Sequence, residues 1–468
     1  MRISGLNLIA WGLTFCPSLF AQAGHDHRAH SRVHEMEGMG PGSGSSGWYS
    51  SGTSQIPLAS PMYGLHRRLG SWTVMLQANA FAVYSNQTGA RGRDKIFGPH
   101  WLMPMATRRV GPGSLTFRSM FTLEPATITR KRYPLIFQTG ELANDIPIIN
   151  GQHPHEFFME LGASYQLRIG DRTALNFFAG PRGEPTLGPP AFPHRITASE
   201  NPMAVLSHHY QDSTHISSSV FTAGLTHGRF TLEASGFHGR EPDERRWGME
   251  TGAIDSFATR LTVNPSSRWT AQFSIGRINN REATHPLRDS LRTSASVFYV
   301  RPLATGHWAS CVIWGRNHDL EFTQLPQLPL AEPAMGNLKE IPQRRYHVVY
   351  VPTRIPGQIY NSYLAESTLF FHKKHWIWGR VENTDRDTLL LFEEAPFVRL
   401  VEEQRYTRVQ AYTGGYEREL PSPAGWLSVG LGGQLTIFVS PDNLKPIYGS
   451  KPLGLQVFLR MRLRDAER

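Results

Sequence analysis

From Trp72 onward, the sequence is built of segments in which apolar and polar residues alternate. In the clearest segment, 453–463, apolar residues occupy every second position, while Arg460 and Arg462 stand between them. Successive side chains of a β-strand point to opposite faces. Each such segment therefore predicts a strand with one apolar and one polar face. The same alternation runs through 72–84, 157–168 and 268–276.

The segment lengths and the connections between them separate two kinds of β-structure. Strands of soluble sandwiches usually have about five or six residues, whereas a tilted strand needs ~9–11 residues to cross a bilayer. The segments here match the longer class. Short turns such as 170–171 and 373–374 follow even-numbered segments, and long connections such as 184–213 and 317–360 follow odd-numbered ones. Membrane-spanning barrels have this alternation of short turns and long loops.

These patterns predict an all-β fold, a transmembrane antiparallel up-and-down β-barrel of about 16 strands, with roughly 14 to 18 as the range. Closure is expected because every backbone N–H and C=O needs a partner in lipid, and a closed barrel leaves no unpaired edge. The predicted strands are 72–84, 97–107, 114–125, 156–169, 172–183, 214–227, 229–239, 253–264, 268–279, 290–300, 306–316, 361–372, 375–384, 404–418, 424–439 and 452–464.

The first 23 residues have the features of a secretory signal peptide. Arg2 supplies a positive charge, residues 6–20 are largely apolar, and residues 21–23 read Ala-Gln-Ala, an A-x-A cleavage site. A lipoprotein anchor at Cys16 is the alternative, but the bulky Phe15 before it is unusual for a lipobox. We therefore predict export, with residues 24–65 as a periplasmic tail and residues 66–468 as a barrel in the outer membrane of a Gram-negative bacterium.

The predicted tail, 24–65, is rich in Gly, Ser, His and Met and has no strand or helix periodicity. Such composition indicates disorder. Imidazole nitrogens suit copper, nickel and zinc, and thioethers suit Cu(I). The tail is thus a candidate copper or other transition-metal site, or else a flexible segment with no specific metal. Its candidate ligands are His25, His27, His30 and His34.

The polar faces of the strands would line the inside of the barrel. About sixteen strands is the size at which a barrel leaves an aqueous channel, so the first functional hypothesis is a water-filled pore for small polar solutes or ions. The candidate lining residues are Arg118, Glu124, Glu160, Arg168, Glu233, Arg260, Glu366, Arg380, Glu382, Arg460 and Arg462. Alternatively, these charges pair across neighbouring strands, or a long connection such as 317–360 folds inward. The protein would then be a loop-plugged barrel that acts as a metal-binding protein, receptor or scaffold.

A second group of histidines, which also includes His194, lies in the long connections that follow the third and fifth strands and at the start of the strand that comes next. Both connections leave the same end of the barrel, so their histidines could meet at its mouth or in its lumen. The sequence is compatible with two roles for these histidines, metal binding and ordinary hydrogen bonding to the backbone. The candidate metal ligands here are His153, His155, His208, His209 and His215.

Asp212, Ser213 and His215 also contain the residue types of a serine-hydrolase triad. A triad needs a base held by a third group and an oxyanion hole, and the sequence has no G-x-S-x-G motif. Three such residues this close in sequence do not easily converge. We therefore predict no enzymatic activity and keep an outer-membrane hydrolase as a remote alternative.

The formal net charge of +10 is spread along the chain without a basic run. Exposure to lipopolysaccharide phosphates or an anion-attracting lumen explains it better than nucleic-acid binding. With its strand pattern and signal sequence, the chain resembles the broad class of Gram-negative porin-like barrels. The resemblance implies outer-membrane lipid, lipopolysaccharide and the barrel assembly machinery as partners. One departure is the C-terminus, Leu463 to Arg468, because such barrels commonly end on an aromatic residue.

Overall fold

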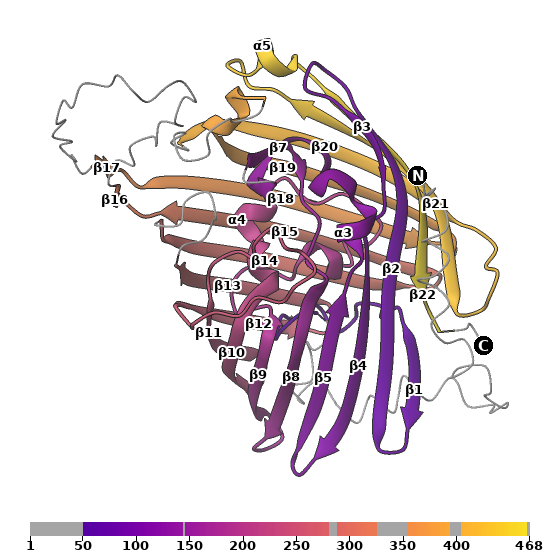
Figure 1. Cartoon of the computed structure of the whole chain (residues 1–468). Coiled ribbons are helices and arrows are strands. Elements are labelled where there is room, and N and C mark those ends of the chain that lie inside the picture. The colour runs from indigo at the N-terminus through magenta and orange to yellow at the C-terminus, as the bar shows by residue number, and fades with distance from the viewer. Residues whose placement is uncertain (1–49, 144–145, 280–287, 325–352, 394–403, 466–468) are drawn as a thin grey trace, which may run out of the picture. The chain divides into compact units, whose positions relative to one another are not determined.

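The computed structural model describes residues 50–143, 146–279, 288–324, 353–393 and 404–465. Its main feature is a closed antiparallel barrel of sixteen strands (Figure 1). Consecutive strands pair with each other around the barrel. The strands are β2 (Trp72–Gln87), β4 (His100–Val110), β5 (Gly113–Phe121), β8 (Phe158–Arg168), β9 (Thr173–Gly183), β10 (Ser217–His227), β11 (Phe230–His238), β12 (Ser256–Ser266), β13 (Trp269–Ile278), β14 (Ser290–Leu303), β15 (Gly306–Asp319), β18 (Gln358–Phe371), β19 (His375–Asp387), β20 (Arg405–Glu419), β21 (Leu427–Val439) and β22 (Leu453–Leu463).

The last strand closes the barrel on the first. Antiparallel pairing of β2 with β22 runs from Asn79 opposite Arg462 to Gln87 opposite Gly454. The short β1 (Leu65–Leu69) continues that edge of β2 beyond β22, and β3 (Asp94–Phe97) continues β4 along the other edge. Pro99 lies between β3 and β4 and separates them, because it has no N–H to donate to a strand ladder. The barrel therefore has sixteen positions although its sheet contains eighteen strands.

The predicted strands are confirmed, with corrections at several ends. Predicted strand 114–125 ends at Phe121, and Glu124 instead begins the one-turn helix α3 (Glu124–Thr127). Predicted strand 214–227 begins at Ser217, because residues 213–216 form a 3-10 turn, η3. Both corrections lie where a strand passes into a long connection, and there the chain turns toward the inside of the barrel.

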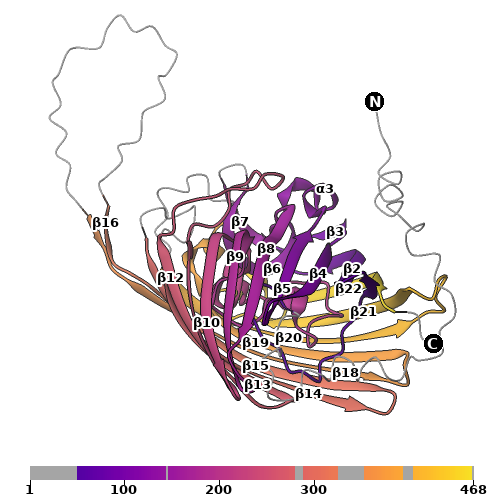
Figure 2. The ribbon, with the colours of Figure 1, turned by 90° about the horizontal axis from the view of Figure 1, so that it is seen from below.

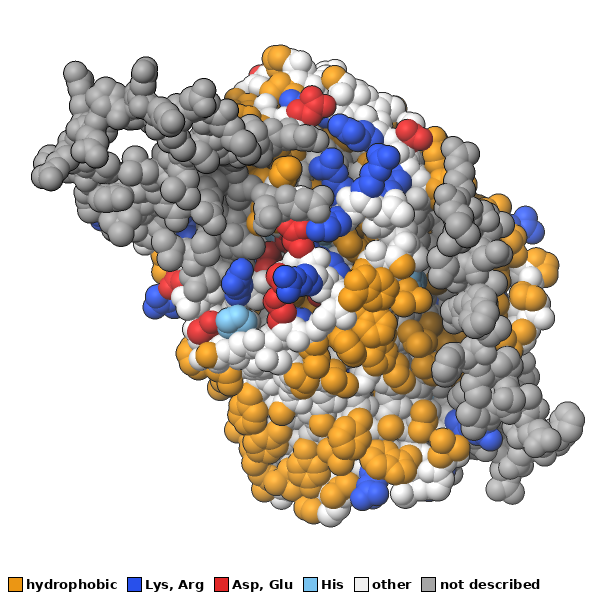
Figure 3. All heavy atoms as spheres, viewed as in Figure 1, with side chains coloured by type: hydrophobic (Ala, Val, Ile, Leu, Met, Phe, Trp, Pro, Cys, Tyr) orange, Lys and Arg blue, Asp and Glu red, His pale blue; other side chains and the backbone are white. Residues whose placement is uncertain are grey.

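The outer surface of the barrel is apolar. Outward-facing side chains such as Leu232, Phe257 and Val312 are 60%, 61% and 62% exposed. Figure 3 shows hydrophobic side chains gathered over the lower part of the view, where β4, β5 and β8 lie. A closed sheet that shows apolar side chains outward and polar ones inward is the architecture of outer-membrane barrels. The predicted fold, a closed transmembrane-type barrel, is confirmed, and it is the architecture that the predicted location in a Gram-negative outer membrane requires.

Among the described residues, no helix is both long enough and apolar enough to cross a membrane.

The depth of an outward residue sets the cost of placing a charge there, which gives a first prediction. Val312 lies at the middle of β15, and Leu303 lies at the end of β14 beside a short turn. Val312→Arg should destabilise the barrel in lipid vesicles by about 2–4 kcal/mol, and Leu303→Arg by only about 0–1 kcal/mol. Denaturant unfolding of both variants in vesicles measures this difference. Equal costs would contradict the membrane placement.

Three segments fill the space inside the strands. The strap comprises residues 50–57, the first inner segment residues 122–157, and the second inner segment residues 184–216; most of their side chains are buried. Figures 1 and 2 show parts of the inner segments, such as α3 and β7, within the curve of the strands. Their elements are α3, η1 (Thr129–Lys131), β6 (Tyr133–Ala143), β7 (Ile146–Gln152), η2 (Phe192–His194), α4 (His208–Gln211) and η3 (Ser213–Ile216).

The remaining elements lie in the later connections. They are β16 (Phe322–Gln324), β17 (Thr353–Ile355), η4 (Thr388–Leu391) and α5 (Lys445–Tyr448). The connection 317–360, which we considered as an inward-folding plug, is described only at its two ends, because 325–352 lies outside the described residues.

The strap corrects the predicted extent of the tail. Residues 24–65 were expected to form the tail, but 50–57 are buried among lumen side chains and β1 pairs with β2. A polar stretch without periodicity is ordered here because the lumen supplies its hydrogen-bond partners. The signal peptide and residues 24–49 lie outside the described residues, and with them the tail histidines His25, His27, His30 and His34.

Candidate functional site: the lumen and its histidine cluster

The predicted lining residues face inward, but they are buried. Nine of them belong to strands and are at most 4% exposed: Arg118, Glu160, Glu233, Arg260, Glu366, Arg380, Glu382, Arg460 and Arg462. Arg168 shares the inward face of β8 and is half-buried at its end. Glu124 is inside the barrel but on α3 and not on a strand. These side chains thus face inward, and protein atoms rather than an open, water-filled space surround most of them.

Opposite charges pair between neighbouring strands. Arg118 contacts Glu160 at 2.8 Å, and Arg260 contacts Glu233 at 3.0 Å. The Arg380 Nε atom donates to Glu366 Oε1 at 2.9 Å. Removing either partner from a buried pair would leave an uncompensated charge. This cross-strand pairing is the arrangement that the sequence offered as the alternative to an open pore.

The strap is held by the same wall charges. Ser51 Oγ and the backbone N–H of Gly52 donate to the Glu160 carboxylate at 3.0 and 3.1 Å. Arg260 donates to the hydroxyls of Thr53 and Ser54, both at 2.9 Å. Gly52 has a φ of +56°, and a Cβ there would lie 2.2 Å from the backbone oxygen of Glu184. The strap thus needs glycine at this position to pass between the wall and the second inner segment.

The second inner segment is anchored by Arg195. Its Nη1 donates to Asp212 at 2.8 Å within the segment, and its Nε donates to Glu366 on β18 at 3.2 Å. Thr197 Oγ1 also donates to Glu366, at 2.8 Å. Burial opposes ionisation of Glu366, and the two arginines around it compensate for that cost.

Further along the second inner segment, two more wall groups hold it. Glu200 lies 3.0 Å from Arg460 and also pairs with Arg462. The backbone N–H of Leu206 donates to Glu382 Oε1 at 2.6 Å. Side chains of β19 and β22, which follow much later in the sequence, therefore hold this inward-folded connection.

The first inner segment combines polar and apolar anchors. Arg246, from the connection between β11 and β12, pairs with both Glu141 and Glu156. Phe137 packs against Tyr448 and Phe438, with ring centres 4.4 and 5.7 Å apart. This segment also contributes residues to the largest buried apolar cluster of the described chain. The lumen is therefore packed like a protein interior.

Five histidines meet where the two inner segments touch. They belong to the second group predicted from the sequence: His153, His155, His208, His209 and His215. The ring centres of His208 and His209 are 5.2 Å apart, and those of His208 and His215 are 5.3 Å apart. His155 lies 5.4 Å from His215, and His153 lies 5.7 Å from His209. The structure brings together five of the six histidines of this group; the sixth, His194, lies apart and packs against Trp101.

Oxygen atoms hold the Nδ1 side of four of these rings. His208 Nδ1 lies 2.7 Å from Asp212 Oδ1, and His155 Nδ1 lies 2.8 Å from Glu124 Oε2. Backbone oxygens take the same role at 2.7 Å for His215 and at 2.9 Å for His153. Carboxylates and carbonyls only accept hydrogen bonds, so Nδ1 carries the proton in each ring.

Burial sets the charge of the cluster. It lowers the pKa of His208 to about 4, against the opposing effect of Asp212. Burial and the neighbouring rings of His208 and His155 hold the pKa of His215 well below its usual range. Burial also acts on His155, but the Glu124 carboxylate outweighs it and raises the pKa of that ring. His208 and His215 are therefore neutral at physiological pH, with Nε2 as the nitrogen that has a lone pair.

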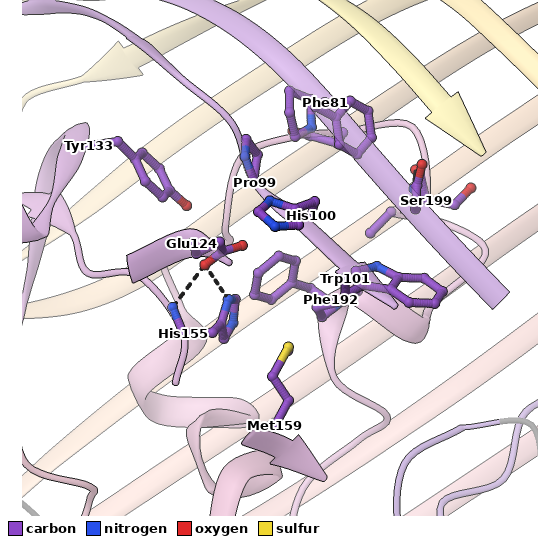
Figure 4. A pocket seen from close by; sticks show the side chains of 15 residues that line it. Phe81, Pro99, His100, Trp101, Glu124, Tyr133, His155, Met159, Phe192 and Ser199 are labelled. Atoms are coloured by element: carbon purple, nitrogen blue, oxygen red, sulfur yellow. Dashed lines mark hydrogen bonds and ion pairs between the residues drawn. The ribbon is translucent and has the colours of Figure 1, made fainter. Parts of the chain in front are cut away.

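A cavity of about 40 Å³ adjoins the cluster. A water needs about 10–15 Å³ by this measure, so the space holds roughly two or three waters. His155 and Glu124 form part of its lining, opposite His100 and Trp101 at the start of β4. Figure 4 shows Glu124 bonded to both the backbone and the ring of His155 beside this space. The cavity gives small species a place next to the histidines.

Asp212, Ser213 and His215, which we considered as a serine-hydrolase triad, are not arranged as a triad. His215 Nδ1 faces the backbone oxygen of Asp212, not its carboxylate. The Asp212 carboxylate serves Arg195 and His208, and Ser213 Oγ accepts from Arg292 at 3.1 Å. No serine–histidine contact therefore links Ser213 to His215 as a nucleophile–base pair.

Several residues of the site had no signal in the sequence pattern. Arg195, Glu200 and Arg246 lie in connections without periodicity, and each finds its partners on distant segments. Asp212 was noticed only as a triad member, whereas its role here is to hold His208 and Arg195. Asp212 follows His208 by four residues, and residues at this spacing are neighbours on a helical turn. This spacing was the available indication that the two side chains pair.

By sequence, no known protein family and no characterised protein matches this chain. Solved structures do match. The anion-selective porin from Comamonas acidovorans aligns with a TM-score of 0.47 and 10% identity over 84% of this chain and 99% of that one. OmpF of Salmonella typhi, in a complex with daunomycin, aligns with a TM-score of 0.45 and 6% identity over 85% of this chain and 100% of its own. OmpT of Vibrio cholerae aligns with a TM-score of 0.42 and 6% identity, with the same coverage.

Proposed function

We propose that the protein is an outer-membrane channel for small polar solutes or ions whose lumen is held closed by its own strap and inner segments. The observation that carries the proposal is the burial of the lumen charges. Arg118, Arg260, Glu366 and Arg460 are at most 3% exposed and each contacts the strap or an inner segment. Passage of a solute then requires that these segments move.

We call the two inner segments together the plug. The way in which they are connected to the strands supports a plug that can move. Gly183 at the end of β9 pairs with Ser217 at the start of β10, and Phe121 pairs with Phe158 in the same way. Both inner segments are therefore insertions between strands that already meet. Barrel closure does not depend on them, so they can shift while the wall stays intact.

The chemistry of the contacts supports the same proposal. Buried ion pairs contribute little net stability compared with apolar packing, and water can replace each partner when a segment leaves. Such pairs hold the second inner segment to Glu366 and Arg460 of the wall. Apolar contacts, such as that of Phe137 with Phe438, add to the attachment, and their surface would be exposed if the inner segments left. The wall that remains is polar and suits a hydrated solute. A closed receptor or scaffold barrel is the competing function, and it requires that the plug never leaves.

Other parts of the functional hypothesis remain proposals. We expect no enzymatic activity, and we expect contacts with lipopolysaccharide and the barrel assembly machinery. Copper capture by the tail histidines, His25, His27, His30 and His34, is an additional role that would bring metal to the barrel.

Liposome swelling tests the proposal on the unmodified protein. Vesicles that contain the protein should swell slowly in a small sugar, because most barrels are closed, and faster once urea below the unfolding midpoint loosens the inner segments. Vesicles with a general porin provide the upper reference and empty vesicles the lower one. Swelling at the porin rate without urea would contradict a closed lumen. Swelling at the empty-vesicle rate at every urea concentration, with the barrel still folded, would favour the receptor or scaffold.

A further inference from the structure

Four of the clustered histidines follow one another in a closed series of neighbouring rings inside the lumen. In the order His153, His155, His215 and His208, neighbouring ring centres are 6.5, 5.4 and 5.3 Å apart, and 6.4 Å separates His208 from His153. Two rings come from the first inner segment and two from the second. The four rings therefore join the two halves of the plug.

These spacings match what a shared metal ion requires. An imidazole nitrogen binds Zn²⁺ at about 2.0–2.1 Å, which places the ring centres around one tetrahedral ion roughly 5 to 6 Å apart. Two of the observed spacings fall within this range and two exceed it slightly. No three ligand side chains of the described residues already stand at coordination positions. Binding would therefore require several of the four rings, and not His153 alone, to move closer together.

The hydrogen bonds orient the rings for this role. A metal-binding histidine typically donates its other ring N–H to a carboxylate or a backbone carbonyl, which fixes the tautomer. All four rings show this arrangement, with Asp212 and Glu124 as the carboxylates. The Nε2 atoms are then the available ligands.

The Nε2 atoms, on the other side of each ring from Nδ1, distinguish these histidines from ordinary core histidines. The Nε2 atoms of His155 and His215 are buried and have no hydrogen-bond partner in the described structure. His153 Nε2 lies 2.7 Å from Glu141 Oε1 but in an orientation unsuited to a hydrogen bond. Buried polar atoms without partners are uncommon, and a bound ion is one of the usual reasons for them.

We propose that His153, His155, His208 and His215 bind one divalent transition-metal ion through their Nε2 atoms. Imidazole ligands select ions such as Zn²⁺ and Cu²⁺ over Mg²⁺ and Ca²⁺. The ion would connect residues 152–155 with residues 208–215 and so hold the two inner segments together. The cavity that His155 lines provides the route by which it reaches the cluster.

Metal binding is measured on the full-length protein in detergent, with the tail ligands removed by His25→Ala, His27→Ala, His30→Ala and His34→Ala. Equilibrium dialysis against Zn²⁺ should then give one ion per barrel. His208→Gln and His215→Gln should each weaken binding at least tenfold. Asp212→Asn, which changes only the partner of His208 and Arg195, should weaken it about 10- to 100-fold.

His194→Gln is the matched control. His194 is also in the second inner segment, half-buried, and its buried Nε2 has no hydrogen-bond partner, but its ring packs against Trp101, outside the four. This variant should keep full affinity. Heat-modifiable gel migration shows that each variant is folded.

A second measurement needs no substitution in the cluster. Cu²⁺ added to the tail-substituted protein should give an electron paramagnetic resonance spectrum with splitting from several nitrogen ligands. The proposal would be overturned if the tail-substituted protein bound no Zn²⁺, or if His194→Gln weakened Zn²⁺ binding as much as the cluster variants do. A copper spectrum with oxygen ligands alone would also overturn it.

Discussion

Replacement of residues 185–215 by a short glycine–serine linker is expected to convert a mostly silent barrel into one that conducts in discrete steps. Gly183 and Ser217 are paired neighbours, so a hairpin linker can join β9 to β10 without strain on the barrel. The deletion removes Arg195 and Glu200, which hold the second inner segment to β18 and β22. The strap and the first inner segment remain, but removal of one of the three segments that fill a sixteen-strand lumen should open part of an aqueous channel, and single-channel conductance in planar bilayers should rise about tenfold or more.

The barrel wall should stay folded after this deletion, because several of its buried charges also pair with other wall residues. Glu366 keeps Arg380 and Arg460 keeps Glu417 after the segment is removed. A matched control keeps the segment in place. Thr197 Oγ1 lies 3.4 Å from the thiol of Cys311, so Thr197→Cys can form a disulfide that ties the segment to β15. The oxidised control should remain silent. A folded deletion variant that is also silent would contradict a plugged channel.

The barrel was predictable because membrane crossing imposes a period and a length. Alternation in 453–463, for example, fixed both the existence of β22 and the inward side of Arg460 and Arg462. Turn and loop lengths then fixed the order of the strands. These are local signals, and they need no knowledge of distant contacts.

The contents of the lumen were not predictable in the same way. The strap is a polar stretch whose order depends on Glu160 and Arg260, and no periodicity indicates such partners. The end of β5 was partly readable, because Pro125 after Glu124 is typical of a helix start. For the histidines, the shared end of the third and fifth connections correctly suggested that they meet. Their Nδ1 partners, such as Asp212, required the fold.

The central claim, a lumen closed by the chain itself, can be tested on the native thiol of Cys311. This side chain faces inward from β15, is 3% exposed and lies between Glu366 and Thr197. In outer membranes, a hydrophilic, membrane-impermeant thiol reagent should leave Cys311 of the wild-type protein unmodified. The same reagent should modify Cys311 in the variant that lacks residues 185–215, which shows that the thiol itself is competent. Rapid labelling of the folded wild-type protein, at the rate of the deletion variant, would show an open aqueous lumen and contradict the closed channel described here.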